Sequence, residues 1–586
     1  MEIPMTEAID QYALETSWST RITDDIVIEA IQGHVPAEME SNILGNIHRI
    51  NSGEMTDKVI YIKLFSILLR EKIGRPVQAI ATQIGHIALQ GTGHNSAEAF
   101  EWGILLIKLC RDAGLYELQK IENDWYVQPN FTLDKKATHK IDKLQYLPPM
   151  QVVPLKWSTN KNGGWLWENK HLILGSKFTK HNQPQAYDVI NKLQSIPWEI
   201  DAATYLFEKE TNRNLNKKKF LRVINEYLDK SFYFVWRYDS RGRSYCSGYD
   251  LSLQSNEYGK ALISLKNKEK IANVPNLYIA IANHAGKDKL TWKERIDWVA
   301  DQVVEEIEWK EPILGRKALR ALEDAVHNRA SGYVMSLDAT SSGLQIMAAI
   351  SGCKKTAAMV NCIDPDTRRD VYTEVADLMN QTLTKPVLRS ISKQSLMTHF
   401  YNSKATPKAL LTDKQLKVFY EVIEGLLPGA DEVMETINNC WDSEADAHTW
   451  TMPDGHVVYV PVVEATDAVY SDAELGDIPL RYYQQTSSDN FRSLCPNIIH
   501  SIDGYIAREM IRRCDFQLSH IHDCFVFSPD HLQEVSQMYR VIMAEIAKGD
   551  ILQDILRQIT GDSSLKITKA SDDLDQDILN SSYMIS

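Results

Sequence analysis

Apolar positions recur along this chain with two different periods. In residues 59–69 and 100–109 they follow the period of a helix that packs on a core, and polar or glycine-containing stretches separate these segments. Further along, short β-prone runs alternate with helical patterns, as in residues 333–346. The pattern predicts a helical region up to about residue 145, followed by an α+β region that is mainly helical.

Residues 333–346 carry the first candidate for chemistry. The first five are β-prone, and those that follow favour a helix with Ser341 or Ser342 as N-cap and Gly352 as its C-terminal stop. Asp338 therefore stands at the exit of a strand, where a side chain can be held at the lip of a cleft. Because Asp is also common at strand ends as a cap, Asp338 alone carries little weight.

A second carboxylate occurs in a matching setting. Residues 516–527 contain two β-prone arms around His522-Asp523, which predicts a hairpin with this pair at its bend. Ser528-Pro529 then opens an amphipathic helix. One Asp at a strand end and one at a hairpin tip fit two-metal phosphoryl transfer, in which hard oxygen ligands on stiff elements hold two divalent ions about 3.5 to 4 Å apart.

A third candidate is one face of a helix predicted to start at Pro386. Every fourth residue along this slowly turning face carries a functional side chain, namely Arg389, Lys393, Met397 and Tyr401. Such a stripe is ordinarily protein surface with one packed ring. On a nucleotide-binding face, the two cations would meet a triphosphate and the ring would meet the base and sugar.

These segments resemble, in the same order, the motifs of the single-subunit DNA-directed RNA polymerases of bacteriophages and mitochondria. The resemblance runs from about Pro149 to the C-terminus. It implies a right-hand fold of palm, fingers and thumb that synthesises RNA from NTPs on a DNA template. The matching strings are Asp338 with Gly343 and Gln345, Arg389-x3-Lys393-x7-Tyr401, His500-Ser-Ile-Asp-Gly504, His522-Asp523, and the Asp-x-x-Gly-Arg motif at 239–243.

The resemblance also implies a division of the chain, and the proline pair Pro148-Pro149 marks a boundary that no helix can cross. The expected regions are a reduced helical N-terminal domain (1–145), the palm entry and thumb (146–236), the palm with the first catalytic Asp (237–345), the fingers (346–450), and the palm with the second catalytic Asp, a hairpin loop and the C-terminal tail (451–586).

For catalysis, the resemblance implies that Asp338 and Asp523 bind two Mg²⁺ ions. Arg389 and Lys393 would bind phosphates, with Lys393 as the general acid that protonates the departing pyrophosphate. The small Gly343 would leave room for a ribose 2'-hydroxyl, where DNA polymerases of this architecture commonly place a bulky Glu. The groups offered to this hydroxyl would be Tyr401 and His500, the latter of which could equally be a core histidine.

Nucleic-acid contacts are expected at the turn 239–243. Gly242 would let the backbone approach a strand closely, and Arg241 and Arg243 would grip phosphates, with Lys260 a similar candidate. The alternative is a plain turn closed by an ion pair to Asp239. The segment from Ala186 to about Phe232, in the expected thumb, is predicted to be helical. It carries the other candidate, a basic run that could equally be a solvated face: Arg213, Lys217, Lys218, Lys219 and Arg222.

Four departures from the family pattern stand out. Asn402 replaces a glycine, and Gln394 stands where a second basic residue is common, so either could soften nucleotide binding. The segment 468–485, where the family reads promoters, is acidic and poorly suited to a DNA groove. The first region is short, which puts promoter reading in doubt.

The final residues, 577–586, match a family tail that packs toward the catalytic site, and a frayed terminus is the competing interpretation.

Composition narrows the setting. A chain of 586 residues suggests roughly two to four subdomains, and a net charge of -14 means that any DNA contact needs a local basic lining. The eight cysteines contain no C-x-x-C pair, which excludes zinc ribbons and thioredoxin chemistry. Without a secretion or import signal or a membrane-length apolar run, we expect a cytoplasmic protein, acting in an infected bacterial host.

The expected partners are template DNA, product RNA and NTPs, with no membrane. The chain is expected to be a monomer, and an accessory initiation factor is a further candidate partner because promoter recognition would be weak or factor-dependent. A family A-like DNA polymerase and a primase-like enzyme are the nearest alternatives. A noncatalytic DNA-binding protein is a more distant one.

Overall fold

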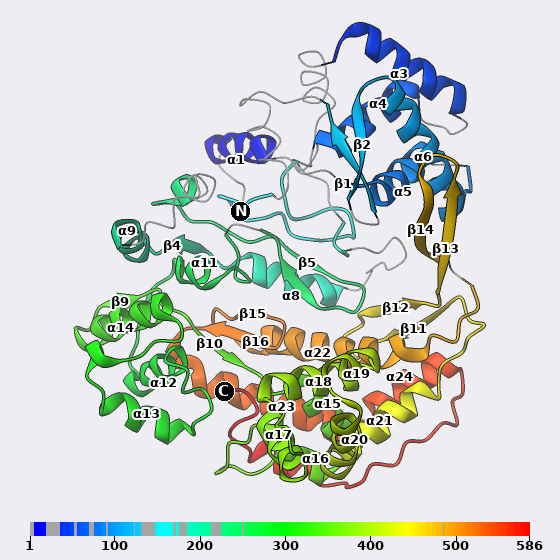
Figure 1. The fold of residues 1–586 in the computed structure, drawn as a ribbon. Helices are drawn as coiled ribbons and strands as arrows, with labels where there is room; N and C mark the ends of the chain where they lie inside the picture. The colour runs from blue at the N-terminus through cyan, green and yellow to red at the C-terminus, as the bar shows by residue number, and fades with distance from the viewer. Residues whose placement is uncertain are drawn as a thin grey trace. The chain divides into compact units, whose positions relative to one another are not determined.

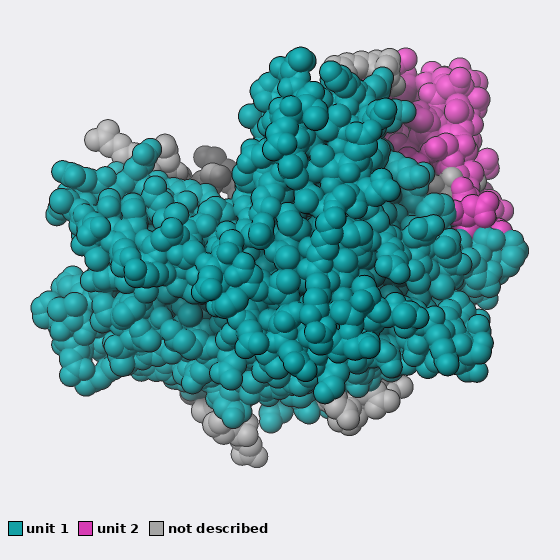
Figure 2. All heavy atoms as spheres, turned by 90° about the horizontal axis from the view of Figure 1, so that it is seen from below, with its two compact units in different colours: residues 1–13, 148–461, 490–586 teal, residues 14–147, 462–489 magenta. Residues whose placement is uncertain are grey.

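The computed structural model describes most of the 586-residue chain. The described residues are 5–18, 35–51, 56–69, 75–89, 92–121, 124–130, 147–167, 171–174, 184–211, 224–248, 251–484 and 486–586. They form an α+β fold in which helices predominate and the sheets are small (Figure 1). Contacts divide the chain into two units, coloured teal and magenta in Figure 2: unit 1 contains residues 1–13, 148–461 and 490–586, and unit 2 contains 14–147 and 462–489.

Unit 2 is built from helices around a buried apolar core. Ile43, Ile60 and Phe100 pack there with Leu480 from a hairpin far along the chain. The longest of its helices, α6 (Ser96–Asp112), begins with a capping box between Asn95 and Glu98. The other elements are α3 (Ala37–Ile50), α4 (Asp57–Leu69), α5 (Val77–Ala88), the sheet β1 (Arg75–Pro76), β3 (Asp124–Pro129) and β2 (Tyr116–Ile121), and the hairpin β13 (Glu464–Asp472) and β14 (Gly476–Gln484). Helix α1 (Met5–Trp18) precedes them.

The acidic tip of the β13–β14 hairpin is neutralised inside unit 2. Lys108 of α6 lies 2.9 Å from a carboxylate oxygen of Asp472, and Arg111 bonds Glu474 and Asp112. The segment expected to be unsuited to a DNA groove therefore uses two of its acids to hold a neighbouring helix.

Unit 1 is organised around a three-stranded antiparallel sheet in the order β10 (Met335–Asp338), β16 (Cys524–Phe527) and β15 (Ser519–Ile521). Its inward side chains, such as Leu337 and Phe525, are fully buried. Helices α15 (Ser342–Ser351), α22 (Leu494–Arg513) and α23 (Leu532–Lys548) pack with one another. The predicted strand, hairpin bend and C-terminal stop are confirmed, the stop by Gly352 at φ 67°.

Two boundary predictions were wrong. The helix with the cationic stripe, α18, spans Arg389–Phe400 rather than starting at Pro386. The reason is that the side chain of Asn380 accepts a bond from the Val387 N–H at 2.7 Å, which keeps the preceding residues extended. The predicted helical stretch 186–232 is interrupted by a strand, β4 (Trp198–Ile200), which separates α8 (Pro184–Gln194) from α9 (Ala202–Thr211). The basic run 213–222 lies outside the described residues.

No described helix of the chain is long and apolar enough to cross a membrane.

Further elements of unit 1 surround the sheet. The remaining strands are β5 (Trp236–Tyr238), β6 (Ser244–Cys246), β7 (Ile263–Leu265), β8 (Glu269–Lys270), β9 (Ala330–Ser331), β11 (Ala447–Thr451) and β12 (Val457–Pro461). The remaining helices are α11 (Glu257–Ala261), α12 (Val274–His284), α13 (Trp292–Ala300), α14 (Pro312–Val326), α16 (Lys354–Met359), α17 (Val371–Thr382), α19 (Ala405–Leu410), α20 (Asp413–Leu426), α21 (Pro428–Asn438), α24 (Ile551–Thr560) and α25 (Leu574–Leu579).

Candidate active site

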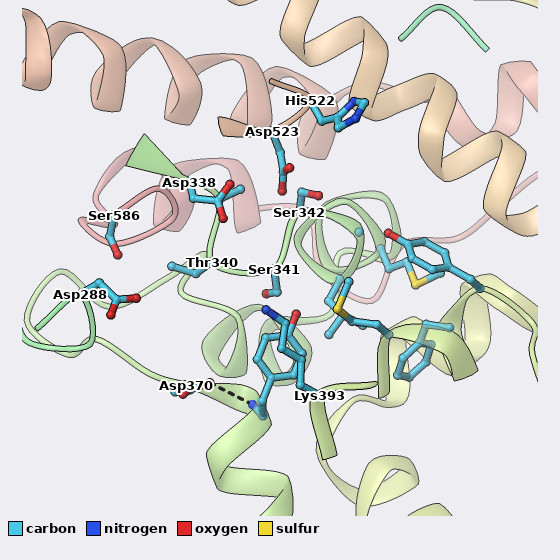
Figure 3. Close-up of a pocket in the computed structure, with 18 of the residues that line it drawn as sticks. Asp288, Asp338, Thr340, Ser341, Ser342, Asp370, Lys393, His522, Asp523 and Ser586 are labelled. Carbon is cyan, nitrogen blue, oxygen red and sulfur yellow. Dashed lines mark hydrogen bonds between the residues drawn. The ribbon is translucent and has the colours of Figure 1, made fainter. Parts of the chain in front are cut away.

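Asp338 and Asp523 meet at one end of the central sheet. Asp338 is the last residue of β10 and pairs with Cys524, the residue after Asp523. The backbone N–H of Ala339 donates to the carbonyl oxygen of Asp523 at 3.2 Å. Both acids line a pocket of about 390 Å³, in which Lys393 lies on the opposite side from them (Figure 3).

The two acids form a buried, mutually repelling pair. Burial, followed by the charge of Asp338, raises the pKa of Asp523 to about 7, while the Ser342 side chain partly opposes the shift through a hydrogen bond. Burial also raises the pKa of Asp338, against the lowering effect of Lys393. Two carboxylates held together in this way carry a charge that only a cation can compensate well.

The face of α18 predicted from its spacing lines the same pocket. Arg389, Lys393, Met397 and Tyr401 all contribute to the wall. Arg389 is held by Asp370, whose carboxylate accepts from its Nε at 2.6 Å. The Lys393 ammonium lies 5.4 Å from the ring centre of Tyr372 and has no carboxylate within ion-pair distance among the described residues.

Tyr401, His500 and Gly343 come together on another wall of the pocket. The rings of Tyr401 and His500 are 5.0 Å apart between centroids. A Cβ atom added to Gly343 would lie 3.1 Å from the Tyr401 hydroxyl oxygen, closer than most Cβ contacts. A glycine at position 343 therefore avoids a close contact with the Tyr401 hydroxyl.

The structure fixes the tautomer of His500. Nη1 of Arg241 lies 2.7 Å from Nδ1 of His500, and a guanidinium has only donors, so Nδ1 accepts and the proton sits on Nε2. Burial, with added repulsion from Arg243 and Arg241, lowers the pKa of His500 to about 2. The ring is therefore a neutral N–H donor at ordinary pH.

The turn 239–243 is tied into the protein. Nε and Nη2 of Arg241 both donate to Oδ2 of Asp239, and Arg243 pairs with Asp503 at 2.7 Å. Gly242 has a φ of 85°, a conformation that favours glycine, and its carbonyl accepts from the buried Arg508. Of these residues Arg243 lines the pocket. Lys260, on α11, is exposed, and its charge lowers the pKa of Asp338.

Comparison with known sequences shows which proteins this chain resembles. Residues 316–452, which include Asp338 and the stripe on α18, match the family described as DNA-dependent RNA polymerase. The chain is similar to DNA-directed RNA polymerases of fungal, phage and mitochondrial origin.

The similar proteins come from several sources. The chain is 26% identical over 520 residues to a probable DNA-directed RNA polymerase of Neurospora crassa, covering 64% of this chain and 58% of the relative. It is 24% identical over 429 residues to the DNA-directed RNA polymerase of Pseudomonas phage phiKMV, covering 60% and 52%. With the mitochondrial DNA-directed RNA polymerase 1 of Arabidopsis thaliana the identity is 23% over 447 residues, covering 62% and 45%. The matches span about half the length of these relatives.

The structure explains one departure from the polymerase pattern. Asn402, which replaces the usual glycine, has a φ of 62°, and asparagine tolerates this left-handed conformation better than most residues. Its side chain exchanges two hydrogen bonds with that of Asn438, at 2.6 and 3.2 Å. The backbone path after Tyr401 therefore survives the substitution.

Sequence reasoning missed several residues of the site. Asp288, Lys289, Arg368 and Asp370 line the pocket, and Asp503 holds Arg243 from below it. The first four of these residues belong to no periodic pattern in the sequence. Asp503 could have been found from its place in the string 500–504. The C-terminal segment packs back as the resemblance suggested: the Ser586 N–H donates to the Asp338 carbonyl at 2.9 Å, and Ile585 forms a bridge with Ala339.

Proposed function

We propose that this chain is a DNA-directed RNA polymerase that extends RNA from NTPs on a DNA template. The observation that carries the proposal is the convergence of Asp338 and Asp523 in a pocket whose other wall is the cationic face of α18. The activities in the relatives' names support it.

A right-hand layout goes with this function. The central sheet β10-β16-β15 would be the palm, and the helices between residues 346 and 450 would be the fingers, with the thumb in 146–236. The position of the two acids at the end of the sheet supports this assignment, because stiff strands hold the ligands in place.

The donor set fits two Mg²⁺ ions. Asp338 and Asp523 are the two carboxylates that the sheet brings together at this pocket, and they would be the protein's ligands. Among the described residues no group of three or more His, Cys, Asp or Glu side chains could hold a metal. Magnesium commonly uses one or two carboxylates and takes its other ligands from water and substrate phosphates. When bound, the ions would supply Lewis-acid activation of the RNA 3'-hydroxyl and neutralise charge on the pyrophosphate.

The chain's own side chains would position the nucleotide and protonate the departing pyrophosphate. Arg389, oriented by Asp370, and Lys393 would hold the triphosphate, and the Lys393 ammonium would give its proton to the departing pyrophosphate oxygen. Nε2–H of His500 and the Tyr401 hydroxyl would face the ribose. A site that bonds a hydroxyl rejects a sugar that lacks it, because its buried polar groups would be left unpaired.

Template contacts belong to the same proposal. The exposed Lys260 is the best placed of the predicted nucleic-acid contacts. Arg243 lines the pocket but pairs with Asp503, and Arg241 is engaged by Asp239 and His500. Promoter recognition would be weak or factor-dependent, since two acids at the hairpin tip bond α6. Action in the cytoplasm of an infected bacterium would suit a phage enzyme of this kind.

The test is synthesis by the purified protein. Supercoiled, linear and single-stranded DNA, and a primed scaffold, are offered with Mg²⁺ and either NTPs or dNTPs. RNA synthesis from NTPs on any of these templates supports the proposal, and mapped start sites show how initiation occurs. Efficient use of dNTPs with little use of NTPs would favour the DNA polymerase alternative, and no synthesis on the primed scaffold would contradict both.

A further inference from the structure

A second cavity, of about 430 Å³, adjoins the catalytic pocket. Lys289, Arg368, Asp370 and Arg389 line both cavities, so the two share these side chains as a common wall. The outer cavity also includes Arg369 and Glu374, which brings its lining to four cations and two carboxylates. It therefore places a lining with more cations than carboxylates beside the catalytic pocket.

Most of these cations have a carboxylate partner. Arg389 pairs with Asp370 at 2.6 Å, Arg369 with Glu374 at 3.2 Å, and Lys289 with Asp288 at 2.7 Å. Their charges are thereby largely satisfied within the protein.

Arg368 is different. Its Nε donates to the Ser586 hydroxyl at 3.3 Å and its Nη1 to the backbone carbonyl of Arg369 at 2.7 Å, both neutral acceptors. In the part of the chain that the structure describes, no carboxylate lies within ion-pair distance of Arg368, and no hydrogen bond uses its Nη2. Burial lowers the pKa of Arg368, and the more distant carboxylates of Asp370 and Asp288 oppose this shift only in part.

We propose that Arg368 forms an outer subsite for a polyphosphate anion between the catalytic pocket and the surface. Its Nη2 and the neighbouring Lys289 ammonium would take the phosphate oxygens. A guanidinium whose only contacts are neutral gains more from such an anion than one already paired, because charge-assisted bonds are roughly twice as strong as neutral ones.

The anion has two sources under the proposed function, on which this inference rests. One is the pyrophosphate that leaves the face of α18, and the other is the triphosphate of an incoming nucleotide. Both carry the same chemistry, so the experiment must separate them.

The test compares Arg368→Gln and Arg368→Lys with the wild type by calorimetric titration with inorganic pyrophosphate and, separately, with an NTP, in the presence of Mg²⁺ and without template. We expect Arg368→Gln to weaken binding of at least one of these anions about tenfold, and Arg368→Lys to restore part of it. If Arg368→Gln binds only pyrophosphate more weakly, the product is the occupant of the subsite. If it also binds the NTP more weakly, the triphosphate of the substrate occupies the subsite as well. The matched control is Arg329→Gln, which removes an arginine paired with Asp324 and Glu323 elsewhere in unit 1 and should leave both affinities unchanged.

Unchanged affinity for both anions in an Arg368→Gln protein with wild-type circular dichroism would overturn the inference. The readout is binding, so it is separable from synthesis. A chain that makes no RNA yet binds pyrophosphate through Arg368 would contradict the proposed function and keep the subsite. An active polymerase whose anion affinities are unchanged in Arg368→Gln would support the proposed function and contradict the subsite.

Discussion

The backbone N–H of Ala339 donates to the carbonyl oxygen of Asp523 at 3.2 Å, so the residue that follows the first candidate acid is bonded to the second. This contact extends the antiparallel ladder in which Leu337 faces Phe525 and Asp338 faces Cys524. Neither β10 nor the β15–β16 hairpin can shift in register without breaking the ladder and exposing buried side chains. The sheet register therefore sets the separation of the two carboxylates.

Gly343 should govern the choice of sugar. In Gly343→Ala the new methyl group would crowd the Tyr401 hydroxyl, from which a Cβ would be 3.1 Å away. We expect the ratio of kcat/KM for an NTP over the matching dNTP to fall by about tenfold or more, as one misplaced methyl group in a pocket can cause. Gly425→Ala in α20 is the control, because nothing lies within 4 Å of its added Cβ. An unchanged ratio in Gly343→Ala would show that Tyr401 does not read the sugar.

Asn402 should tolerate glycine better than alanine. Asn402→Gly keeps the positive φ and loses the bonds to Asn438, whereas Asn402→Ala also strains the backbone by about 1 to 2 kcal/mol. We expect Asn402→Ala to have the lower free energy of unfolding in urea and the higher KM for NTPs. Asn438→Ala removes the bonds alone and serves as the reference. The reverse order of the two Asn402 variants would mean that backbone conformation is not what the residue provides.

His500 should stay neutral and carry its proton on Nε2. In ¹⁵N-histidine-labelled protein, with His500→Asn used to assign the signal, we expect an unprotonated Nδ1 from pH 8 down to pH 5, since the pKa is lowered to about 2. Arg241→Gln should admit the other tautomer and lower NTP-over-dNTP discrimination. A protonated Nδ1 in the wild type would refute the donor role assigned to Nε2.

His520 should make the stability of unit 1 depend on pH. Its Nδ1–H donates to the His522 carbonyl at 2.9 Å, so Nε2 accepts from the Ser244 hydroxyl at 2.6 Å, and burial lowers its pKa to about 4. The unfolded chain, with a pKa of about 6.5, binds more protons between these values, so stability is lost as the pH falls below about 6.5.

We expect about 2 kcal/mol of this contribution to be lost from pH 7 to pH 5, measured as the free energy of unfolding in urea. His520→Asn should reduce the slope by this amount and leave the contribution of His500, whereas His327→Asn, at an exposed histidine, should not change it. Equal slopes in the wild type and His520→Asn would exclude His520 as the titrating group.

The parts of the fold and site that could be predicted are those marked by short local sequence patterns. The strand that ends at Asp338, the hairpin around Asp523 and the face of α18 each lie within a dozen or so residues, where period and turn chemistry are visible. The start of α18 could not be predicted, because it depends on a bond from Val387 to Asn380. Sequence alone gave no sign that residues 462–489 pack with residues 14–147.

The missed site residues depend on contacts between distant segments. Asp503 is 260 positions from the Arg243 that it holds, and Arg368 reaches the pocket from an irregular segment that carries no periodic pattern. The tautomer of His500 depends on a partner 259 positions away. Such pairs arise from packing, which a single sequence does not display.

The most direct test of the central claim is elongation of a primed RNA on a DNA scaffold by Asp338→Asn and Asp523→Asn, with Mn²⁺ binding followed by electron paramagnetic resonance. Asp472→Asn, which alters an acid paired with Lys108 in unit 2, is the control. We predict that each site variant folds and binds the scaffold, loses Mn²⁺ affinity and elongates at least about 1,000-fold more slowly, equivalent to about 4 kcal/mol. Strong residual elongation or undiminished Mn²⁺ binding by either variant would contradict a shared metal site.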